Sequence, residues 1–226
     1  MLRYAITDRH MFSGEEQQRQ NALIAYAHRL AQGEADLIQI REKDLSLPAL
    51  ETLARRILNT LHANLRTTDQ DTNPTPPSIL LNGPANLAAA VHADGIHLPG
   101  NSGPVGLALA RHAFATAGLP PPLTSISCHT PEDLRSAALA GFDYLLFGPI
   151  FEKRIHGRLV RHGLGLHQLQ AAVHLLHTLH PHPEAPYSKA PKLLALGGVT
   201  EENAPLCLKA GADGIAGIRL FLLPPR

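Results

Sequence analysis

The chain has 226 residues, with 20 Lys and Arg against 19 Asp and Glu, a formal charge of +1, and 4% aromatic residues with no Trp. This balance argues against nucleic acid as a partner, because it lacks both a basic surface and rings on which bases stack. No apolar run approaches the ~18 residues of a membrane span, and the first residues lack the charged-then-apolar order of a signal peptide. We expect a cytoplasmic protein with no membrane partner and a single domain spanning residues 1–226.

One short pattern recurs four times: a small residue or Phe, then Asp, then an apolar run prone to form a strand. The copies begin at Ala35, Ala93, Phe142 and Ala212. A segment with helical apolar spacing precedes each copy, and further strands are expected at 4–7, 79–81, 125–127 and 193–196. Strands alternating with helices predict a parallel sheet, and eight of them in about 200 residues predict a closed (β/α)8 TIM barrel, an α/β fold. An open doubly wound sheet is the alternative.

The chain ends soon after its last expected strand. Beyond residues 214–217 only 218–226 remain, which is too short for a full helix. We therefore expect the last helix of the barrel to be shortened or missing. The apolar flank that this leaves predicts a homo-oligomer, in which a second copy covers it.

The most polar strand end reads Gln-Ile-Arg-Glu-Lys-Asp over 39–44. Functional groups of such barrels lie where strands end. Alternation places Gln39 and Arg41 on the face opposite Ile38 and Ile40, so they point into the barrel mouth if the isoleucines pack against the outer helices. An inward arginine needs an anion, which is either a ligand phosphate or a carboxylate of the protein.

A second candidate is the Gly197-Gly198 pair that follows the strand at 193–196. Glycines let the backbone approach an anion closely, and exposed amides there can hold a phosphate. Thr200 is the expected N-cap of a helix that starts near Glu201, and Gly217 ends the last strand, beside the usual phosphate site of barrels. A simple turn is the other interpretation of Gly-Gly.

Residues 127–133 form a third candidate. Thr130 with Asp133 resembles an N-capping box with Pro131 at the first helical position. His129 is not explained by that box, and it either transfers protons near neutral pH or hydrogen-bonds to a loop. Alternation turns Cys128 away from the mouth, which argues against a nucleophile.

The chain has 14 histidines, and one helical segment holds His167, His174, His177 and His180. Their spacing permits metal binding, but no carboxylate or cysteine joins them, so we expect a solvated helix face and no metal site. His97, at the end of the fourth strand, is either a packed core histidine or a ligand contact.

In this order, the motifs resemble those of the thiamine phosphate synthase and TenI family of phosphate-binding (β/α)8 barrels. They are YAITD (4–8), QIREKD (39–44), LLNGPANLA (80–88), ADGIHLP (93–99), SCHT (127–130), DYLLFGPIFE (143–152), LGGVTEENA (196–204) and AGADGIAGI (210–218). The resemblance covers almost the whole chain, and several motifs in fixed order are far more specific than any one.

The family contains two chemistries. The synthase joins a hydroxymethylpyrimidine diphosphate to a thiazole phosphate carboxylate and releases diphosphate with the help of magnesium. Its diphosphate-binding side chains resemble Gln39, Arg41, Lys43 and Asn82. Its two magnesium-binding aspartates are replaced here by Gly83 and Ser102, and its lysine-bearing loop is altered at 153–158. Magnesium would therefore have few hard oxygen ligands.

The TenI branch is similar in these departures, and its active members are metal-independent tautomerases of a thiazole phosphate carboxylate. Its catalytic histidine matches His129. The resemblance implies proton transfer at His129, phosphate binding by Gly197, Gly198, Gly217, Ile218 and Arg219, carboxylate binding near Arg41 or Lys43, and Ser127 beside the substrate.

We therefore predict an isomerase, a thiazole tautomerase, that acts on a phosphorylated small molecule and needs no cofactor. The alternative is a thiamine phosphate synthase, a transferase, which alone would call for magnesium. A second alternative is a non-catalytic regulator that binds a phosphorylated ligand.

Overall fold

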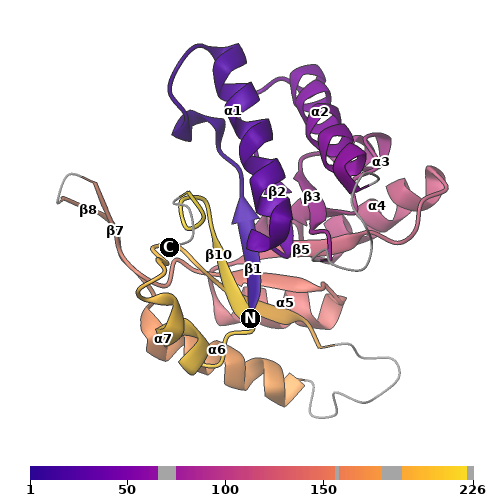
Figure 1. Cartoon of the computed structure of the whole chain (residues 1–226). Helices are drawn as coiled ribbons and strands as arrows, with labels where there is room; N and C mark the ends of the chain where they lie inside the picture. The colour runs from indigo at the N-terminus through magenta and orange to yellow at the C-terminus, as the bar shows by residue number, and fades with distance from the viewer. Residues whose placement is uncertain (66–74, 156–157, 180–189, 223–226) are drawn as a thin grey trace.

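The structure is a computed structural model that describes residues 1–65, 75–155, 158–179 and 190–222. Its parallel strands close into an eight-stranded barrel in the order β1-β10-β9-β6-β5-β4-β3-β2 (Figure 1). They are β1 (Leu2–Ile6), β2 (Leu37–Ile40), β3 (Ser78–Asn82), β4 (Gly95–Leu98), β5 (Leu123–Cys128), β6 (Tyr144–Phe147), β9 (Lys192–Leu196) and β10 (Gly214–Gly217). The predicted TIM barrel is confirmed over the open sheet.

Helices follow the strands on the outside of the barrel. They are α1 (Glu16–Arg29), α2 (Leu47–Leu65), α3 (Ala85–Ala90), α4 (Gly103–Thr116), α5 (Pro131–Ala140), α6 (Gly165–Leu179) and α7 (Ala204–Lys209), with short 3-10 turns η1 (Arg9–Met11) and η3 (Gly100–Ser102) and a π-helical turn η2 (Leu30–Glu34). An antiparallel hairpin, β7 (Lys153–Ile155) with β8 (Arg158–Arg161), interrupts the connection after β6 and projects from the body (Figure 1). No helix in the described ranges is long and apolar enough to cross a membrane.

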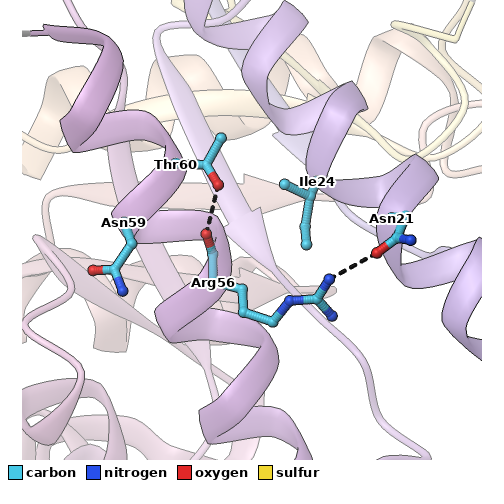
Figure 2. A pocket seen from close by; sticks show the side chains of 5 residues that line it. All are labelled: Asn21, Ile24, Arg56, Asn59 and Thr60. Atoms are coloured by element: carbon cyan, nitrogen blue, oxygen red, sulfur yellow. Dashed lines mark hydrogen bonds between the residues drawn. The ribbon is translucent and has the colours of Figure 1, made fainter.

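Helices α1 and α2 lie side by side and leave a pocket of about 370 Å³ on the outer surface (Figure 2). Its walls are Asn21 and Ile24 of α1 and Arg56, Asn59 and Thr60 of α2. The Arg56 guanidinium donates to Asn21 Oδ1 at 2.7 Å across it. None of the strand ends that carry the predicted site contributes to this pocket.

The fourfold aspartate pattern has a physical role. In each copy the carboxylate accepts the backbone amide that opens or nearly opens the preceding barrel strand. The pairs are Asp36 with Arg3 at 2.7 Å, Asp94 with Ile79 at 2.7 Å, Asp143 with Thr124 at 2.9 Å and Asp213 with Leu193 at 2.9 Å. The repeat therefore ties neighbouring strands together at the N-terminal rim, opposite the mouth.

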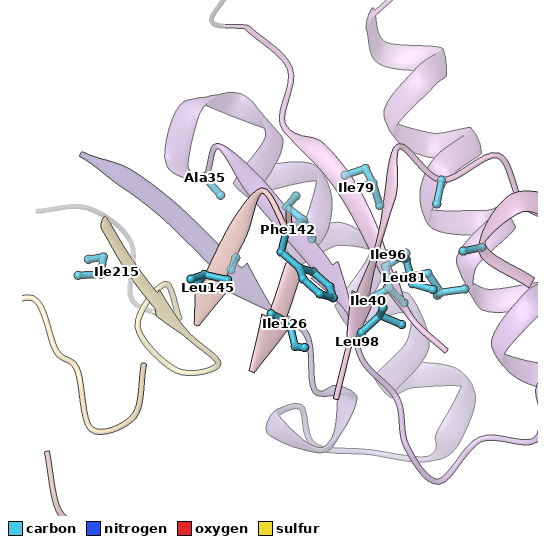
Figure 3. Packing of buried hydrophobic residues seen from close by; sticks show 14 of the residues in the cluster. Ala35, Ile40, Ile79, Leu81, Ile96, Leu98, Ile126, Phe142, Leu145 and Ile215 are labelled. Carbon is cyan, nitrogen blue, oxygen red and sulfur yellow. The ribbon is translucent and has the colours of Figure 1, made fainter. Parts of the chain in front are cut away.

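Two apolar clusters pack against the two faces of the barrel sheet. The outer one lies between barrel and helices and includes Ile40, Ile96 and Ile126 (Figure 3). The inner one fills the barrel with Tyr4, Ile6, Leu37, Leu80, Leu146, Leu194 and Ala216. Because Leu37 is inside and Ile38 and Ile40 are outside, alternation carries Gln39 and Arg41 inward, as predicted.

The residues that follow β10 form a short cover on the outside of the barrel. Residues 218–222 form turns, and no helix follows β10 in the part that the structure describes. Leu220 and Phe221 are buried. Arg29 donates to the Phe221 carbonyl, and the Arg3 guanidinium lies 5.1 Å from the centre of the Phe221 ring. The flank expected to be bare is therefore partly covered, and self-association stays a prediction.

Candidate active site

Polar side chains line the mouth along four neighbouring strands, β2 to β5. They are Gln39, Arg41, Asn82, His97, Ser125 and Ser127, and we call them the polar arc. Asn82 pairs with His97 in the strand register, and His97 pairs with Ser125. Side chains at paired positions of neighbouring strands lie on the same face. The predicted site residues among them, Gln39, Arg41, Asn82 and Ser127, therefore come together inside the barrel with His97 and Ser125.

The other half of the interior is apolar. Its residues, the apolar arc, are Ile6 of β1, Leu146 of β6, Leu194 and Leu196 of β9, and Ala216 and Ile218 at β10. Of the predicted phosphate-binding residues, only Ile218 belongs to it. A ligand in the mouth therefore meets hydrogen-bonding groups on one side and hydrocarbon on the other.

A hydrogen-bonded chain runs through the polar arc from the barrel centre. The Tyr4 hydroxyl lies 2.8 Å from Ser125 Oγ, which lies 2.9 Å from Nδ1 of His97, and Nε2 of His97 lies 3.1 Å from Ser127 Oγ. Burial, together with the cations Arg41 and Lys43, lowers the pKa of His97 to about 3, so the ring is neutral. His97 is thus a hydrogen-bonded core histidine that also touches a predicted substrate residue.

Which group donates in each of these hydrogen bonds can be assigned from one buried group, the Tyr4 hydroxyl. Tyr4 is 0% exposed, and its hydroxyl hydrogen finds no acceptor except Ser125 among the described residues. Leaving that donor unpaired is costly, so Tyr4 donates to Ser125, Ser125 donates to Nδ1, and Nε2–H of His97 donates to Ser127. The Ser127 hydrogen is then free to donate into the mouth. The sequence did not point to Tyr4 or Ser125.

The β2 end offers groups without partners. Arg41 is partly exposed, and no carboxylate in the described part of the chain pairs with its guanidinium. Gln39 is 1% exposed, and its Oε1 has no hydrogen-bond donor there either. Buried polar atoms are rarely left unpaired, so these two side chains favour a ligand over an internal ion pair.

His129 directly follows β5, and its ring is fixed from one side. Nδ1 donates to the carbonyl of Gly148, which leaves Nε2 as the acceptor. The predicted capping box is confirmed: Asp133 accepts the amides of Thr130 at 3.0 Å and His129 at 2.8 Å. The hydrogen bond to the loop is therefore confirmed, and proton transfer by the free Nε2 stays a prediction.

Two other side-chain candidates lie away from the mouth of the barrel. Cys128 is buried in the outer cluster, and burial raises its thiol pKa to about 12, which removes it as a nucleophile. His167, His174 and His177 lie on α6, whereas His180 lies outside the described residues. Within the described ranges no three His, Cys, Asp or Glu residues are placed to hold a metal.

The Gly197-Gly198 turn has a steric explanation of its own. Their φ angles are +91° and +68°, and a Cβ at either position would lie 2.6 to 2.7 Å from atoms of Pro149 or Phe151. Only glycine fits both demands. The turn interpretation is therefore correct, and it is compatible with the phosphate interpretation.

The helix after this turn starts later than predicted. α7 begins at Ala204, because the Thr200 amide donates to Asn203 Oδ1 at 2.8 Å and closes a separate turn first. Pro205 then lies in the first helical turn, where proline is favoured. The N-cap of α7 is thus Asn203, whereas Thr200 caps the turn before it, with its Oγ1 accepting the Asn203 amide at 3.4 Å. Any phosphate here would rest on loop amides.

Such amides are available at two neighbouring strand ends. Within the part of the chain that is described, those of Gly197, Gly198 and Val199 after β9, and of Ile218 and Arg219 after β10, donate to no protein group. β9 and β10 are paired in the barrel, and the exposed Arg219 adds a cation. Gly217 ends β10 between them. Phosphate binding here stays a prediction that this arrangement permits.

Comparisons with known proteins agree with the barrel and its motifs. The family model described as "Thiamine monophosphate synthase" matches residues 3–221. The "Thiamine-phosphate synthase" of Koribacter versatilis is 32% identical, over 99% of this chain and 90% of the relative. A Geobacter sulfurreducens protein that carries that name provisionally is 31% identical, over 98% and 87%. A solved structure titled "Thiamine phosphate pyrophosphorylase" from Pyrococcus furiosus superimposes with a TM-score of 0.65 at 22% identity, covering 96% of this chain and 85% of that one. The chain belongs to the thiamine monophosphate synthase family, a family of thiamine biosynthesis.

Proposed function

We propose that this protein is a thiamine phosphate synthase, which transfers a hydroxymethylpyrimidine group from its diphosphate to the ring nitrogen of a thiazole phosphate. The observation that carries the proposal is two separate sets of unpaired anion-binding groups at one mouth. Arg41 and Lys43 are one set, and the free amides after β9 and β10 are the other. A reaction between one substrate that carries a diphosphate and another that carries a phosphate needs two anion-binding places. The names of the relatives at 31% and 32% identity favour this reaction over tautomerisation.

In the transfer, the bond between the methylene carbon and the diphosphate oxygen breaks, and the diphosphate leaves with the electron pair. The thiazole nitrogen supplies the pair for the new C–N bond. Arg41 and Lys43 stabilise the charge that grows on the departing diphosphate, and the Ser127 hydroxyl donates to it. Leu196 and Ile218 of the apolar arc pack against the rings and keep water away from the reacting carbon.

Magnesium, which the family resemblance implies for this reaction, does not fit the residues present. Gly83 and Ser102 offer no carboxylate. The two carboxylates beside Arg41 in the sequence, those of Glu42 and Asp44, are bound by Arg9. We therefore assign the neutralisation of the diphosphate to the chain's own cations and derive no step through a resident metal.

A second candidate, the thiazole tautomerase, is favoured by one observation. The ring of His129 is oriented through Nδ1, and its Nε2 is available as an acceptor. A base held in this way moves a proton between the ring carbon and the exocyclic carbon of a thiazole phosphate carboxylate. The reaction needs no metal, which suits the described residues.

Parallel assays separate the two candidates. The purified chain is given hydroxymethylpyrimidine diphosphate with thiazole phosphate, with and without magnesium, and separately the thiazole phosphate carboxylate tautomer in EDTA. Release of diphosphate that is lost in Arg41→Gln supports the synthase. Tautomerisation that is lost in His129→Ala but kept in His174→Ala, an exposed histidine on α6, supports the second candidate instead. Absence of both reactions contradicts both and leaves a binding protein.

A further inference from the structure

One buried arginine holds both carboxylates of the β2 loop. Glu42 and Asp44 alternate in sequence with the cations Arg41 and Lys43. Arg9, at the start of η1, is 4% exposed. Its guanidinium donates to Asp44 at 2.7 and 2.6 Å, one bond to each oxygen, and to Glu42 Oε2 at 3.2 Å. The pKa of the Asp44 carboxyl lies well below its ordinary value, mainly because of these bonds.

The buried Glu42 carboxylate also accepts hydrogen bonds from residues that follow β1. The Thr7 hydroxyl donates to Glu42 Oε1 at 2.7 Å, and the Arg9 amide donates to Oε2 at 3.1 Å. The amide of Arg41 in turn donates to Thr7 Oγ1 at 2.9 Å. These bonds fix the backbone at the residue where the chain leaves β2.

The two cations are left without counter-ions. No carboxylate of the described residues pairs with Arg41 or Lys43. Both cations help to lower the pKa of His97, so their charge reaches the polar arc. The four residues 41–44 are neutral in sum. If Glu42 and Asp44 were not bound elsewhere, they would be the nearest counter-ions for the two cations.

We propose that Arg9 is a positioning residue: by binding Glu42 and Asp44, it leaves Arg41 and Lys43 unpaired at the mouth, where they bind the phosphorylated substrate. This inference rests on the proposed function, since it takes these cations as the ligands of the diphosphate. Arg9 itself touches no substrate. It separates the charges of one short segment into bound carboxylates and available cations.

Titration calorimetry of the full chain with inorganic diphosphate tests the proposal. Arg9→Gln should weaken binding about tenfold or more, because released carboxylates compete for the cations. The triple variant Arg9→Gln/Glu42→Gln/Asp44→Asn lacks both the arginine and the competing carboxylates, and it should regain an affinity within about threefold of the starting protein. Lys192→Gln removes the cation of an ion pair at the opposite rim and should leave binding unchanged.

Arg9→Gln also leaves the Glu42 carboxylate buried without a cation, which destabilises the fold. The double variant Arg9→Gln/Glu42→Gln avoids this and keeps Asp44 charged, so it should bind diphosphate more weakly than the triple variant. Thermal melts verify that each variant is folded.

The outcomes separate this inference from the proposed function. If Arg41→Gln weakens binding while folded Arg9→Gln and the double variant bind normally, the role of Arg9 is refuted and the anion site stands. A triple variant as weak as Arg9→Gln would assign Arg9 a purely structural role and would also overturn the proposal. If Arg9→Gln weakens binding and the triple variant restores it, but no diphosphate is released from the pyrimidine substrate, the synthase reaction fails and the role of Arg9 stands. A starting protein with no affinity for diphosphate would overturn both.

Discussion

The polar and apolar arcs line the same barrel, yet the apolar arc is fully packed at its centre and the polar arc keeps polar groups without partners among the described residues. Leu146, Leu194 and Ala216 of the apolar arc are fully buried and packed together. The polar arc keeps a buried amide oxygen on Gln39 without a donor and a guanidinium on Arg41 without a carboxylate among the described residues. Folding alone does not account for such unpaired groups. The difference indicates that one arc stabilises the barrel and the other is arranged for a ligand.

The largest effect is expected for a truncation deep in the apolar arc. Leu194→Ala removes a side chain that is 0% exposed and leaves a cavity that the closed barrel cannot collapse around. The free energy of unfolding should fall by about 2–5 kcal/mol, as measured by urea denaturation. Leu206→Ala on α7, where the side chain is 47% exposed, should cost less than about 0.5 kcal/mol. Equal losses in the two variants would contradict the assignment of stability to this arc.

In the polar arc, the corresponding variant should change activity and leave stability alone. Arg41→Gln removes a cation that holds no protein partner in the described chain, so the melting temperature should not fall. The value of kcat/KM for the diphosphate substrate should drop about a hundredfold, or about 2.7 kcal/mol in transition-state stabilisation. Arg55→Gln, which breaks an exposed pair with Glu51 on α2, serves as the charge-matched control. A change below about threefold in Arg41→Gln would remove Arg41 from the anion site.

The buried His97 of the polar arc should make the stability of the fold depend on pH. The pKa of His97 is about 3 in the folded protein, below the ordinary value of about 6.5. Between these values the unfolded chain binds one more proton, so stability falls as the pH drops below about 6.5. From pH 7.5 to pH 5 this amounts to about 2 kcal/mol, and urea denaturation should show that the loss is absent in His97→Gln. His112→Gln, at an exposed position on α4, should keep it. An unchanged pH dependence in His97→Gln would mean that the ring is charged or exposed when folded.

Sequence reasoning reached the parts of the molecule that local periodicity determines. The aspartate repeat predicted the positions of every second barrel strand. Alternation from Ile38 and Ile40 predicted that Gln39 and Arg41 point into the barrel. The capping box at Thr130 and Asp133 involves residues three apart, so the sequence alone predicts it.

What the sequence could not predict depends on partners that are far apart in the chain. Ser125 meets Tyr4 across 121 residues, and Arg9 meets Asp44 across 35. The sequence around Tyr4 is that of an aromatic residue packed inside a barrel. Its hydrogen bond to Ser125 is visible only once the barrel has closed. Phe221 likewise lies in an apolar tail of the sequence, and only its contacts with Arg3 and Arg29 show that it covers the barrel flank next to β10. The sequence also could not decide between synthase and tautomerase, because both reactions use the anion-binding motifs that the chain retains.

The smallest expected effect tests whether Tyr4 sets the direction of the hydrogen-bonded chain. Tyr4→Phe keeps the ring that fills the barrel and removes only the hydroxyl, so the free energy of unfolding should change by about 1 kcal/mol. Without that donor, Ser125 can accept from His97 instead, the imidazole can take its other tautomer, and Ser127 can donate to the ring instead of into the mouth. Activity should then fall severalfold, more than the small change in stability explains. Tyr26→Phe is the matched control, because the buried Tyr26 hydroxyl has no hydrogen-bond partner among the described residues. Its removal should leave activity unchanged and stability equal or slightly higher. If both phenylalanine variants behave alike, the order of donors in the polar arc is not set by Tyr4, and Ser127 loses its assignment as a fixed donor.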